Sequence, residues 1–540
     1  MKKRYSVFFI CLFLAAVLSG CGKSRNENKE ISITIPSTPD TVDPQLVAET
    51  NSVFVADCFT STLYEYNENR ELVPCLAQSC DISDDGLTYT FHLKKGLKWS
   101  DGRPLTAEDF VFALQRLADP DTGSNSVYFI TDCCSIKNAK EVSLGTKPVN
   151  ELGVSSPDDD TFVVELTQPC PYFCALVSAV TFSPCNEDFY HSTGKNYANS
   201  AENLLSSGPY IIDRYEPLAM QIHFKKNPYY MDADKITIPG INLQVVANQQ
   251  QALMCYESDT VDIISISGEL VELAEGDPEL FVFPQASLFF FELNQINCPA
   301  LMNRNIRMAL NKSLDREDLV NNLLKSGYTS MTRAIPSDFY IQGDGTDFAE
   351  DRERYDEYMA YDTVKAQKLW EQGLSELGVS RVSLTMIYNS SQSSFCEAVK
   401  AQMEKNLPGL DIELKPVQGK ELIQRRMSGN YDMLFLGWVA DYADPTAFLD
   451  QFISSAHDGE YNNPEYDKIC ERIQGVEFVG NTAARDDMMH KAEDMLMEDA
   501  ALIPVFTKGN TFLIHDDIKG FQQPPTGIGL VLRSLSKEVK

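Results

Sequence analysis

Positive charge and histidine are both scarce in this sequence. Its 540 residues include 46 Lys and Arg against 78 Asp and Glu, a formal net charge of −32 at pH 7. Nucleic acids bind surfaces where positive charge is clustered, so this balance excludes a nucleic-acid-binding protein. No histidine has a second histidine within a helical turn, and no metal site is predicted from the six: His92, His191, His223, His457, His490 and His515.

Motifs of catalysis and cofactor binding are also missing. The sequence contains no GxSxG, no HExxH, no Walker loop and no strand-linked GxGxxG. The segment 81–92 begins like a calcium loop, but Ser83 stands where Asp or Asn is expected and His92 where a bidentate Glu is required. Nothing in the sequence therefore indicates an enzyme or a cofactor.

Long apolar runs are absent beyond the first twenty residues. Positive residues at 2–4 precede an apolar run over 7–18, which is shorter than the ~20 residues of a membrane-spanning helix. This pattern is typical of a secretory signal. The run ends in LSGC at 18–21, which resembles the lipobox of bacterial lipoproteins and implies cleavage after residue 20 and lipidation of Cys21. The polar stretch 21–30 would then be a tether; an ordinary signal with a chance cysteine is the alternative.

The number of cysteines does not decide whether they form disulfides or stay as free thiols. Of 14 cysteines, 12 remain after loss of the signal and lipidation of Cys21. An even number in an exported chain permits disulfides, and Cys75–Cys80 and Cys170–Cys174 are local candidates. Small buried thiols in a reducing habitat are the alternative.

The body of the chain predicts a mixed α/β fold. At ~150 residues per domain, its length corresponds to two to four domains. Strand patterns alternate with helix patterns, which favours a parallel-rich sheet covered by helices on both sides. The predicted strands are 31–35, 86–93, 161–166, 210–212, 221–224, 382–388, 412–416 and 433–438.

Three helices are predicted from their N-terminal caps. Thr106 begins one, with Asp109 three residues further on, and Asp362 begins another that runs to Glu376. A third begins at 481–482. Its buried face is expected to contain Ala484, Met488, Ala492 and Met495.

One stretch carries the most specific pattern in the chain. Residues 76–116 read LAQSCDISDDGLTYTFHLKKGLKWSDGRPLTAEDFVFALQR. This resembles the signature of the peptide/nickel class of bacterial extracellular solute-binding proteins, the receptors of ABC importers, with Cys80 where that class commonly has Trp. Further matches follow in order, including SSGPYIIDRYEP (206–217), FFELNQ (290–295), NRNIRMALNKSLDREDLV (303–320) and YDMLFLGWVADYADPTAFLD (431–450).

The resemblance implies an α/β, two-lobed clam of the periplasmic-binding-protein type (type II) with an additional domain in the first lobe. The core domain of lobe I is expected to comprise 31–66, 204–287 and 506–540. The additional domain is expected at 67–203, and lobe II at 288–505. Crossings near 287–291 and 504–508 would permit hinge closure over a ligand.

The resemblance also implies a ligand anchor after the strand predicted at 433–438. In oligopeptide-binding members, the Asp of an ADY motif pairs with the peptide's α-amino group, and here that role falls on Asp441. A charge-assisted hydrogen bond of this kind contributes ~1.5–3 kcal/mol. The alternative is an Asp that caps the next helix, although Asp444 followed by Pro445 supplies a better cap.

Further ligand contacts are expected from backbone groups on both lobes and from aromatic side chains. The backbone candidates are Gly437, Trp438, Val439 and Ala440 on one side and Glu49, Thr50 and Asn51 on the other. For the aromatic candidates, core packing is an equal alternative; these are Trp438, Tyr442, Tyr128 and Phe506. Arg425 and Arg426 could bind a C-terminal carboxylate or lie on a solvated helix face.

Together these features imply a lipid-anchored, monomeric receptor on the outer face of the cell membrane. It would capture oligopeptides through backbone hydrogen bonds and Asp441, without a cofactor, and deliver them to the subunits of an ABC permease. The ADYADP segment at 440–445 resembles the oligopeptide version of this loop rather than the GDNGDP-like dipeptide version. The alternatives are the same scaffold binding an oligosaccharide or a metal complex, and a surface enzyme.

Overall fold

The computed structural model describes residues 29–216, 218, 220–325, 327–350, 358–454, 461–527 and 529–538. The predicted signal peptide (1–20), Cys21 and the tether up to residue 28 lie outside these residues. Among the helices that are described, none is long and apolar enough to cross a membrane.

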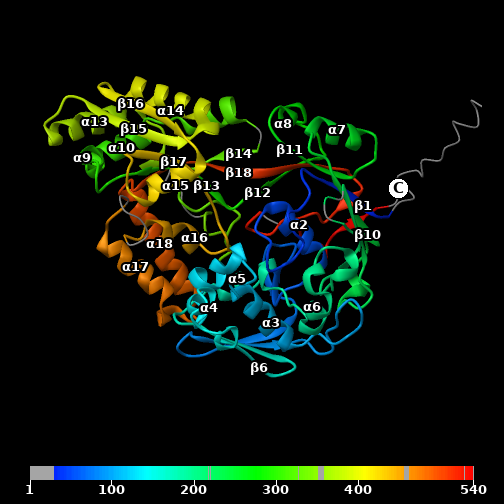
Figure 1. The fold of residues 1–540 in the computed structure, drawn as a ribbon. Coiled ribbons are helices and arrows are strands. Elements are labelled where there is room, and N and C mark those ends of the chain that lie inside the picture. The colour runs from blue at the N-terminus through cyan, green and yellow to red at the C-terminus, as the bar shows by residue number, and fades with distance from the viewer. Residues whose placement is uncertain are drawn as a thin grey trace, which may run out of the picture.

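A sheet of twelve strands runs through the molecule (Figure 1). Its strands are β1 (Ile31–Ile35), β8 (Tyr210–Arg214), β9 (Gln221–Lys226), β10 (Gly240–Val245), β11 (Ile263–Ile266), β12 (Leu280–Pro284), β13 (Ser287–Leu293), β14 (Tyr328–Ser330), β15 (Val382–Asn389), β16 (Leu410–Val417), β17 (Met433–Val439) and β18 (Leu502–Ile514). The order is β16-β15-β17-β13-β18-β11-β1-β10-β9-β8, and β12 and β14 also pair with β18. The strand predictions within this sheet are confirmed.

The prediction of a parallel-rich sheet is wrong. β1 is parallel to β10 and β11, and β15 is parallel to β16 and β17. The other pairs are antiparallel. The reason is that β13 and β18 lie at the centre of the sheet and are antiparallel to their neighbours. The alternation of strands and helices over 382–438 does not reveal their direction.

The 13-residue strand β18 belongs to two parts of the sheet. Residues 502–506 pair with β13, whereas residues 509–514 pair with β11 and β12. We call β1 and β8–β12 the first half-sheet and β13–β17 the second half-sheet. Between β12 and β13 the chain passes from one half-sheet to the other, and it does so again inside β18.

Helices pack around the second half-sheet in a common apolar core. In Figure 1, α10 (Arg304–Lys312), α13 (Thr363–Leu377) and α14 (Ser393–Asn406) gather around β15 and β16. Asp362 is the N-cap of α13, because its carboxylate accepts the Lys365 N–H at 2.9 Å. Gly378 ends the helix with a φ of 67°, a conformation that glycine adopts readily. The helix predicted to begin at Asp362 is therefore confirmed.

The signature stretch contributes two strands to a separate antiparallel sheet of four strands. Its strand order is β4 (Ala77–Ile82), β5 (Thr88–Leu93), β7 (Thr161–Glu165) and β6 (Val154–Asp158). In β5, Tyr89, Phe91 and Leu93 are buried, as the alternation predicts. Helix α3 (Ala107–Ala118) packs against this sheet, and it begins with the predicted capping box between Thr106 and Asp109.

The remaining helices flank these sheets. On the first half-sheet side are α2 (Thr50–Phe59), α7 (Gln249–Glu257) and α8 (Glu269–Leu273). Near the four-stranded sheet are α4 (Ala139–Ser143), α5 (Phe173–Leu176) and α6 (Glu187–Thr193). Others are α9 (Pro299–Met302), α11 (Arg316–Asp318), α15 (Gly419–Met427), α16 (Thr446–Leu449), α17 (Pro464–Gln474) and α18 (Thr482–Glu498).

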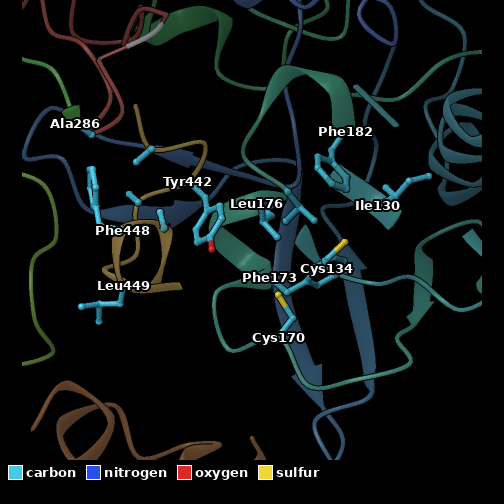
Figure 2. Close-up of a cluster of buried hydrophobic side chains, with 14 of the residues drawn as sticks. Ile130, Cys134, Cys170, Phe173, Leu176, Phe182, Ala286, Tyr442, Phe448 and Leu449 are labelled. Atoms are coloured by element: carbon cyan, nitrogen blue, oxygen red, sulfur yellow. The ribbon is translucent and has the colours of Figure 1, made fainter. Parts of the chain in front are cut away.

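The largest apolar core joins the four-stranded sheet to α16–α18. Figure 2 shows part of it, where Tyr442 lies between Phe448 on one side and Leu176 on the other. The Tyr442 ring is stacked on Tyr172, with centroids 4.2 Å apart and planes 5° apart. Segments 67–203 and 288–505 therefore share a core, although the resemblance assigns them to different lobes.

The predicted buried face of α18 is shifted. Ala492 is buried, but Ala484, Met488 and Met495 are only partly buried. The buried positions are instead Arg485, Asp486, Met489, Ala492, Glu493, Leu496 and Met497. Apolar spacing misplaces this face because two charged residues on it are matched by partners elsewhere in the chain: Arg485 pairs with Asp444, and Glu493 accepts the backbone N–H of Ala334 at 3.1 Å.

The 12 cysteines among the described residues are free. Neither local candidate pair, Cys75–Cys80 or Cys170–Cys174, is bonded. Cys75 and Cys170 are buried, and burial raises the pKa of both thiols. The structure therefore favours small buried thiols over disulfides.

Candidate functional site

The segment after β17 carries the predicted anchor, Asp441. The Ala440 N–H donates to the Ala286 carbonyl at 2.8 Å, which extends the β13–β17 pairing by one residue before the chain turns. Asp444 then supplies the start of α16, because its carboxylate accepts the Thr446 N–H at 3.1 Å. Asp441 is therefore not needed as a helix cap.

Asp441 accepts a hydrogen bond from a distant part of the chain. The Tyr128 hydroxyl donates to its Oδ1 atom at 3.0 Å, across 313 sequence positions. Surrounding protein displaces water and raises the pKa of Asp441, and the Tyr128 hydrogen bond partly lowers it. No Lys, Arg or His among the described residues forms an ion pair with this carboxylate. A cationic ligand group would supply the missing positive charge.

An unpaired strand edge lies beside Asp441. β13 pairs with β17 from Met433 to Val439, whereas β15 pairs only with residues 433–435. The bond from Ala440 to Ala286 fixes the alternation of this antiparallel pair, so Gly437 and Val439 direct their N–H and C=O groups away from β13. An extended ligand can pair with such an edge as an added strand.

Gly437 is the residue type that its neighbour on β13 requires. A Cβ at this position would overlap the ring of Phe289. That ring is stacked on Phe506, with centroids 4.6 Å apart. The absence of a side chain at Gly437 therefore leaves room for the Phe289 ring.

Trp438 is partly buried against the largest core. Its indole N–H is buried and has no acceptor among the described residues. A buried donor without an acceptor costs about 1–3 kcal/mol. The indole N–H is therefore enclosed by the protein and is not part of the cavity wall.

A cavity of about 630 Å³ adjoins Asp441. Ligand sites typically have volumes of ~300–1,000 Å³, so this space suits a small solute. Its walls come from α2 and from the segments 126–129, 175–181, 440–443 and 530–534. Four predicted site residues line it: Tyr128, Ala440, Asp441 and Tyr442. Three others, Gly437, Trp438 and Val439, are not part of the lining.

Tyr442 and Ala440 contribute to the wall mainly through packing. Both are buried in the largest core, and the stack of Tyr442 on Tyr172 fixes its ring. Burial raises the pKa of Tyr442 well above its usual range. Its hydroxyl lies 3.5 Å from the Thr446 hydroxyl. Tyr442 therefore shapes the cavity as a fixed, neutral ring.

The predicted contact segment at 49–51 is engaged with its own chain. Glu49 is the N-cap of α2, because its carboxylate accepts the Asn51 N–H at 2.8 Å. The Asn51 amide donates to the Ser37 hydroxyl at 2.6 Å, and Thr50 is the exposed first residue of the helix. None of the three lines the cavity, whereas their neighbours Val47 and Ala48 do. Ligand contact by Glu49, Thr50 and Asn51 stays a prediction.

Other candidates are placed away from the cavity. Phe506 is 3% exposed and packs in the core of the second half-sheet. Arg426 is buried with Glu292, at an N–O distance of 2.8 Å, and Arg425 pairs with Glu421 at 2.7 Å. Both arginines therefore already form ion pairs with carboxylates of the protein. The positions of the two arginines in the α15 sequence do not show these pairs.

Five charged residues in the cavity wall were not predicted: Asp57, Glu65, Glu68, Lys235 and Arg533. Asp57 comes from α2, Glu65 from the short strand β2 (Tyr64–Tyr66), and Arg533 from the last residues of the chain. Arg533 and Glu65 form an ion pair at 3.0 Å. Asp57 follows an apolar stretch of α2, and Arg533 lies far along the chain from the other residues of the wall. No local sequence pattern therefore identifies either residue as part of a ligand site.

Comparison with known families gives the class of this protein. The sequence pattern of "Bacterial extracellular solute-binding proteins, family 5 Middle" matches residues 71–460. The chain belongs to this family. It is therefore an extracytoplasmic solute-binding protein and not an enzyme, and the predicted resemblance is confirmed.

Sequence relatives and solved structures match this family 5 protein over nearly its whole length. The "Dipeptide-binding protein" of Lactococcus lactis is 30% identical over 535 residues, or 96% of each chain. The unliganded open form of the MppA periplasmic murein tripeptide binding protein has a TM-score of 0.83 at 26% identity, over 95% of this chain and 98% of the other. For Listeria monocytogenes OppA bound to peptide, the TM-score is 0.67 at 28% identity, over 94% and 99%. These similarities confirm the type II, two-lobed α/β fold class.

Proposed function

We propose that this protein is the substrate-binding component of an ABC importer and captures short, extended peptides. The observation that carries the proposal is Asp441, a partly desolvated carboxylate that has no cationic partner among the described residues and lies between a cavity and an open strand edge. Its relatives include a dipeptide-binding protein and a peptide-bound OppA, which supports a peptide as the ligand.

Asp441 would bind the α-ammonium group of the peptide. In the absence of ligand, its only described hydrogen-bond donor is the Tyr128 hydroxyl, at 3.0 Å. Asp441 is an exposed residue whose carboxylate is partly desolvated by the surrounding protein. An ammonium group would bring the opposite charge to it, and a charge-assisted hydrogen bond of this kind contributes ~1.5–3 kcal/mol. The charge would therefore fix the end of the peptide without reading its sequence.

The peptide backbone would pair with the open edge of β17. Gly437 and Val439 direct their N–H and C=O groups toward this edge. Since every peptide carries the same backbone groups, such pairing gives affinity with little side-chain selectivity.

The structure resembles the receptor before capture. Its TM-score is 0.83 with an unliganded open form but 0.67 with a peptide-bound relative, at similar sequence identity. We therefore interpret the described conformation as open, with lobes that close when a peptide joins them. Closure would involve the two chain passages at β12–β13 and within β18.

The finer organisation is part of the same proposal. Lobe I would consist of 31–66, 204–287 and 506–540 with the additional domain 67–203, and lobe II of 288–505. A lipid on Cys21 would hold the monomeric receptor on the outer face of the cell membrane, near the permease subunits. Expression of Cys21→Ser in the native host tests the anchor: the variant is expected in the medium, and retention in the membrane fraction would contradict lipidation.

Calorimetric titration with tripeptides tests the proposal. Free tripeptides are expected to bind with micromolar or better affinity, and N-acetylation or Asp441→Asn is expected to weaken binding about tenfold or more, because each removes one charge of the pair. Asp487→Asn, which changes an exposed carboxylate on α18, is the matched control and should bind as the wild type does. Equal affinity for acetylated and free peptides would overturn the role of Asp441.

A further inference from the structure

The charges that line the cavity are unequal in sign. Its carboxylates are Asp57, Glu65, Glu68 and Asp441, and its cations are Lys235 and Arg533. Both cations already have partners. Arg533 pairs with Glu65 and with Asp232, each at 3.0 Å, and Lys235 pairs with the same Asp232 at 3.0 Å. Both cations of the wall are therefore paired with carboxylates of the protein itself.

Asp57 lacks a cation inside this wall. Its carboxylate accepts a hydrogen bond from the backbone N–H of Leu530, and no Lys, Arg or His among the described residues pairs with it. Gly529 permits this contact, because a Cβ there would overlap the Asp57 Oδ2 atom. The segment 529–530 therefore packs against the carboxylate, and Asp57 and Leu530 both line the cavity.

Desolvation of the Asp57 carboxylate costs free energy that no cation among the described residues offsets. Burial raises the pKa of Asp57 to about 7, and only the Leu530 hydrogen bond opposes this. A neutral side chain at this position of α2 would avoid the cost of desolvation. Ionisable groups that are desolvated in a cavity often serve ligand binding.

We propose that Asp57 binds the cationic side chain of a Lys or Arg residue in the captured peptide, so that this receptor prefers basic peptides. The inference rests on the proposed function and names its substrate class. Asp441 would bind the α-ammonium group and Asp57 the side chain, from two different walls of one cavity. Within the part of the chain that the structure describes, these two carboxylates have no cationic partner, and they match the two positive charges of a peptide that has a basic residue near its N-terminus.

Tripeptides that differ in one charge test this assignment. Lys is placed at position 1, 2 or 3 of an alanine tripeptide, and norleucine, which is of similar size and uncharged, replaces it in the matched set. At one position at least, the Lys peptide is expected to bind about tenfold or more tightly than its norleucine partner. In Asp57→Asn, which keeps an acceptor for the Leu530 N–H, the two should bind within about threefold of each other.

The pH dependence gives an independent readout. The Lys preference should decline from about pH 8 to about pH 6, because protonation of Asp57 removes its charge, while norleucine peptides change little. Cys58 interacts with Asp57 on the same helix. The other charged and titratable groups of the cavity wall are Glu65, Glu68, Lys235, Asp441, Arg533, Tyr66, Tyr128, Tyr230 and Tyr442. In Asp57→Asn the decline should disappear.

Each result separates the two proposals. If neither set of peptides binds, the proposed function fails. If both sets bind equally well to the wild type, peptide capture stands and the preference for basic peptides is wrong. If Asp57→Asn weakens Lys and norleucine peptides alike, Asp57 only positions the 529–534 segment and the inference is also wrong. Asp84→Asn, an exposed carboxylate outside the cavity wall, controls for net charge and should retain the Lys preference.

Discussion

At the scale of single residues, the hydrogen bond from Tyr128 to Asp441 should set the pH range of binding. This bond lowers the pKa of Asp441, against the effect of desolvation. Tyr128→Phe removes it and should raise that pKa. The ionised carboxylate binds the ammonium group, so affinity is present above the pKa and is lost as pH falls through it. For an uncharged tripeptide, calorimetry across pH should place this loss about 0.5–1 pH unit higher in the variant.

The control for this experiment is Tyr361→Phe, which removes an exposed hydroxyl outside the cavity wall. It should leave the pH profile of binding unchanged. A profile for Tyr128→Phe that coincides with the wild-type profile would show that the tyrosine does not influence Asp441 during binding.

Gly437 offers a second test at this scale. Gly437→Ala would push a methyl group into the Phe289 ring, which is stacked on Phe506. Overpacking of this kind should lower the free energy of unfolding by about 1–3 kcal/mol in denaturant titrations. Gly419→Ala is the matched control, because the nearest atom to its new Cβ is the Asn389 side-chain nitrogen at 3.4 Å. Equal stability of both variants would contradict the packing argument.

Individual site residues were predictable to different degrees. The ADY motif indicated Asp441, and the nearby Asp444-Pro445 correctly explained how α16 begins. Glu49 could not be assigned from sequence, because a carboxylate before a helix serves equally well as a cap or as a ligand contact. Asp57 was missed because its place in the cavity depends on residues 529–530, at the other end of the chain.

At the scale of elements, the open edge of β17 predicts a pattern of sensitivity along the ligand. Methylation of a peptide nitrogen removes one donor and blocks close pairing at that position. A series of tripeptides, each N-methylated at one amide, should therefore show alternation. Methylation of an amide that faces β17 should weaken binding by about 1–3 kcal/mol in calorimetry, whereas methylation of one that faces away should change it little. Uniform tolerance of all methylations would contradict strand addition.

Elements were predictable where local signals define them. Caps at Thr106 and Asp362 and alternation in β5 each depend on neighbouring residues. The buried face of α18 was not predictable, because Arg485 is buried only through its pairing with Asp444, 41 positions away. The mixed sheet was likewise hidden, since the direction of β13 and β18 depends on strands far along the chain.

At the scale of the whole molecule, peptide binding should make the receptor more compact. The fold is nearer to an open, unliganded relative than to a peptide-bound one. A saturating tripeptide should therefore lower the radius of gyration measured by small-angle X-ray scattering. At a ligand concentration 100 times Kd, it should also stabilise the folded state by about 2.7 kcal/mol.

Asp441→Asn at the same peptide concentration is the control for closure and should show a smaller decrease in the radius of gyration. If calorimetry shows full occupancy of the wild type while the scattering curve does not change, the proposed closure is wrong. The two-lobed class itself was predictable from the signature stretch. The core shared by segments 67–203 and 288–505 was not, because it depends on contacts such as the stack of Tyr172 on Tyr442.

The position of β18 has a consequence for biosynthesis. This strand lies near the C-terminus, yet it pairs with β13 and β14 on one side of the molecule and with β11 and β12 on the other. A nascent chain lacks the central strand of its sheet until about its five-hundredth residue has been made. Premature folding is thereby discouraged during secretion, when a polypeptide has to be threaded through a narrow translocation channel. Products truncated before this strand would lack a complete core on either side and would be readily degraded by proteases.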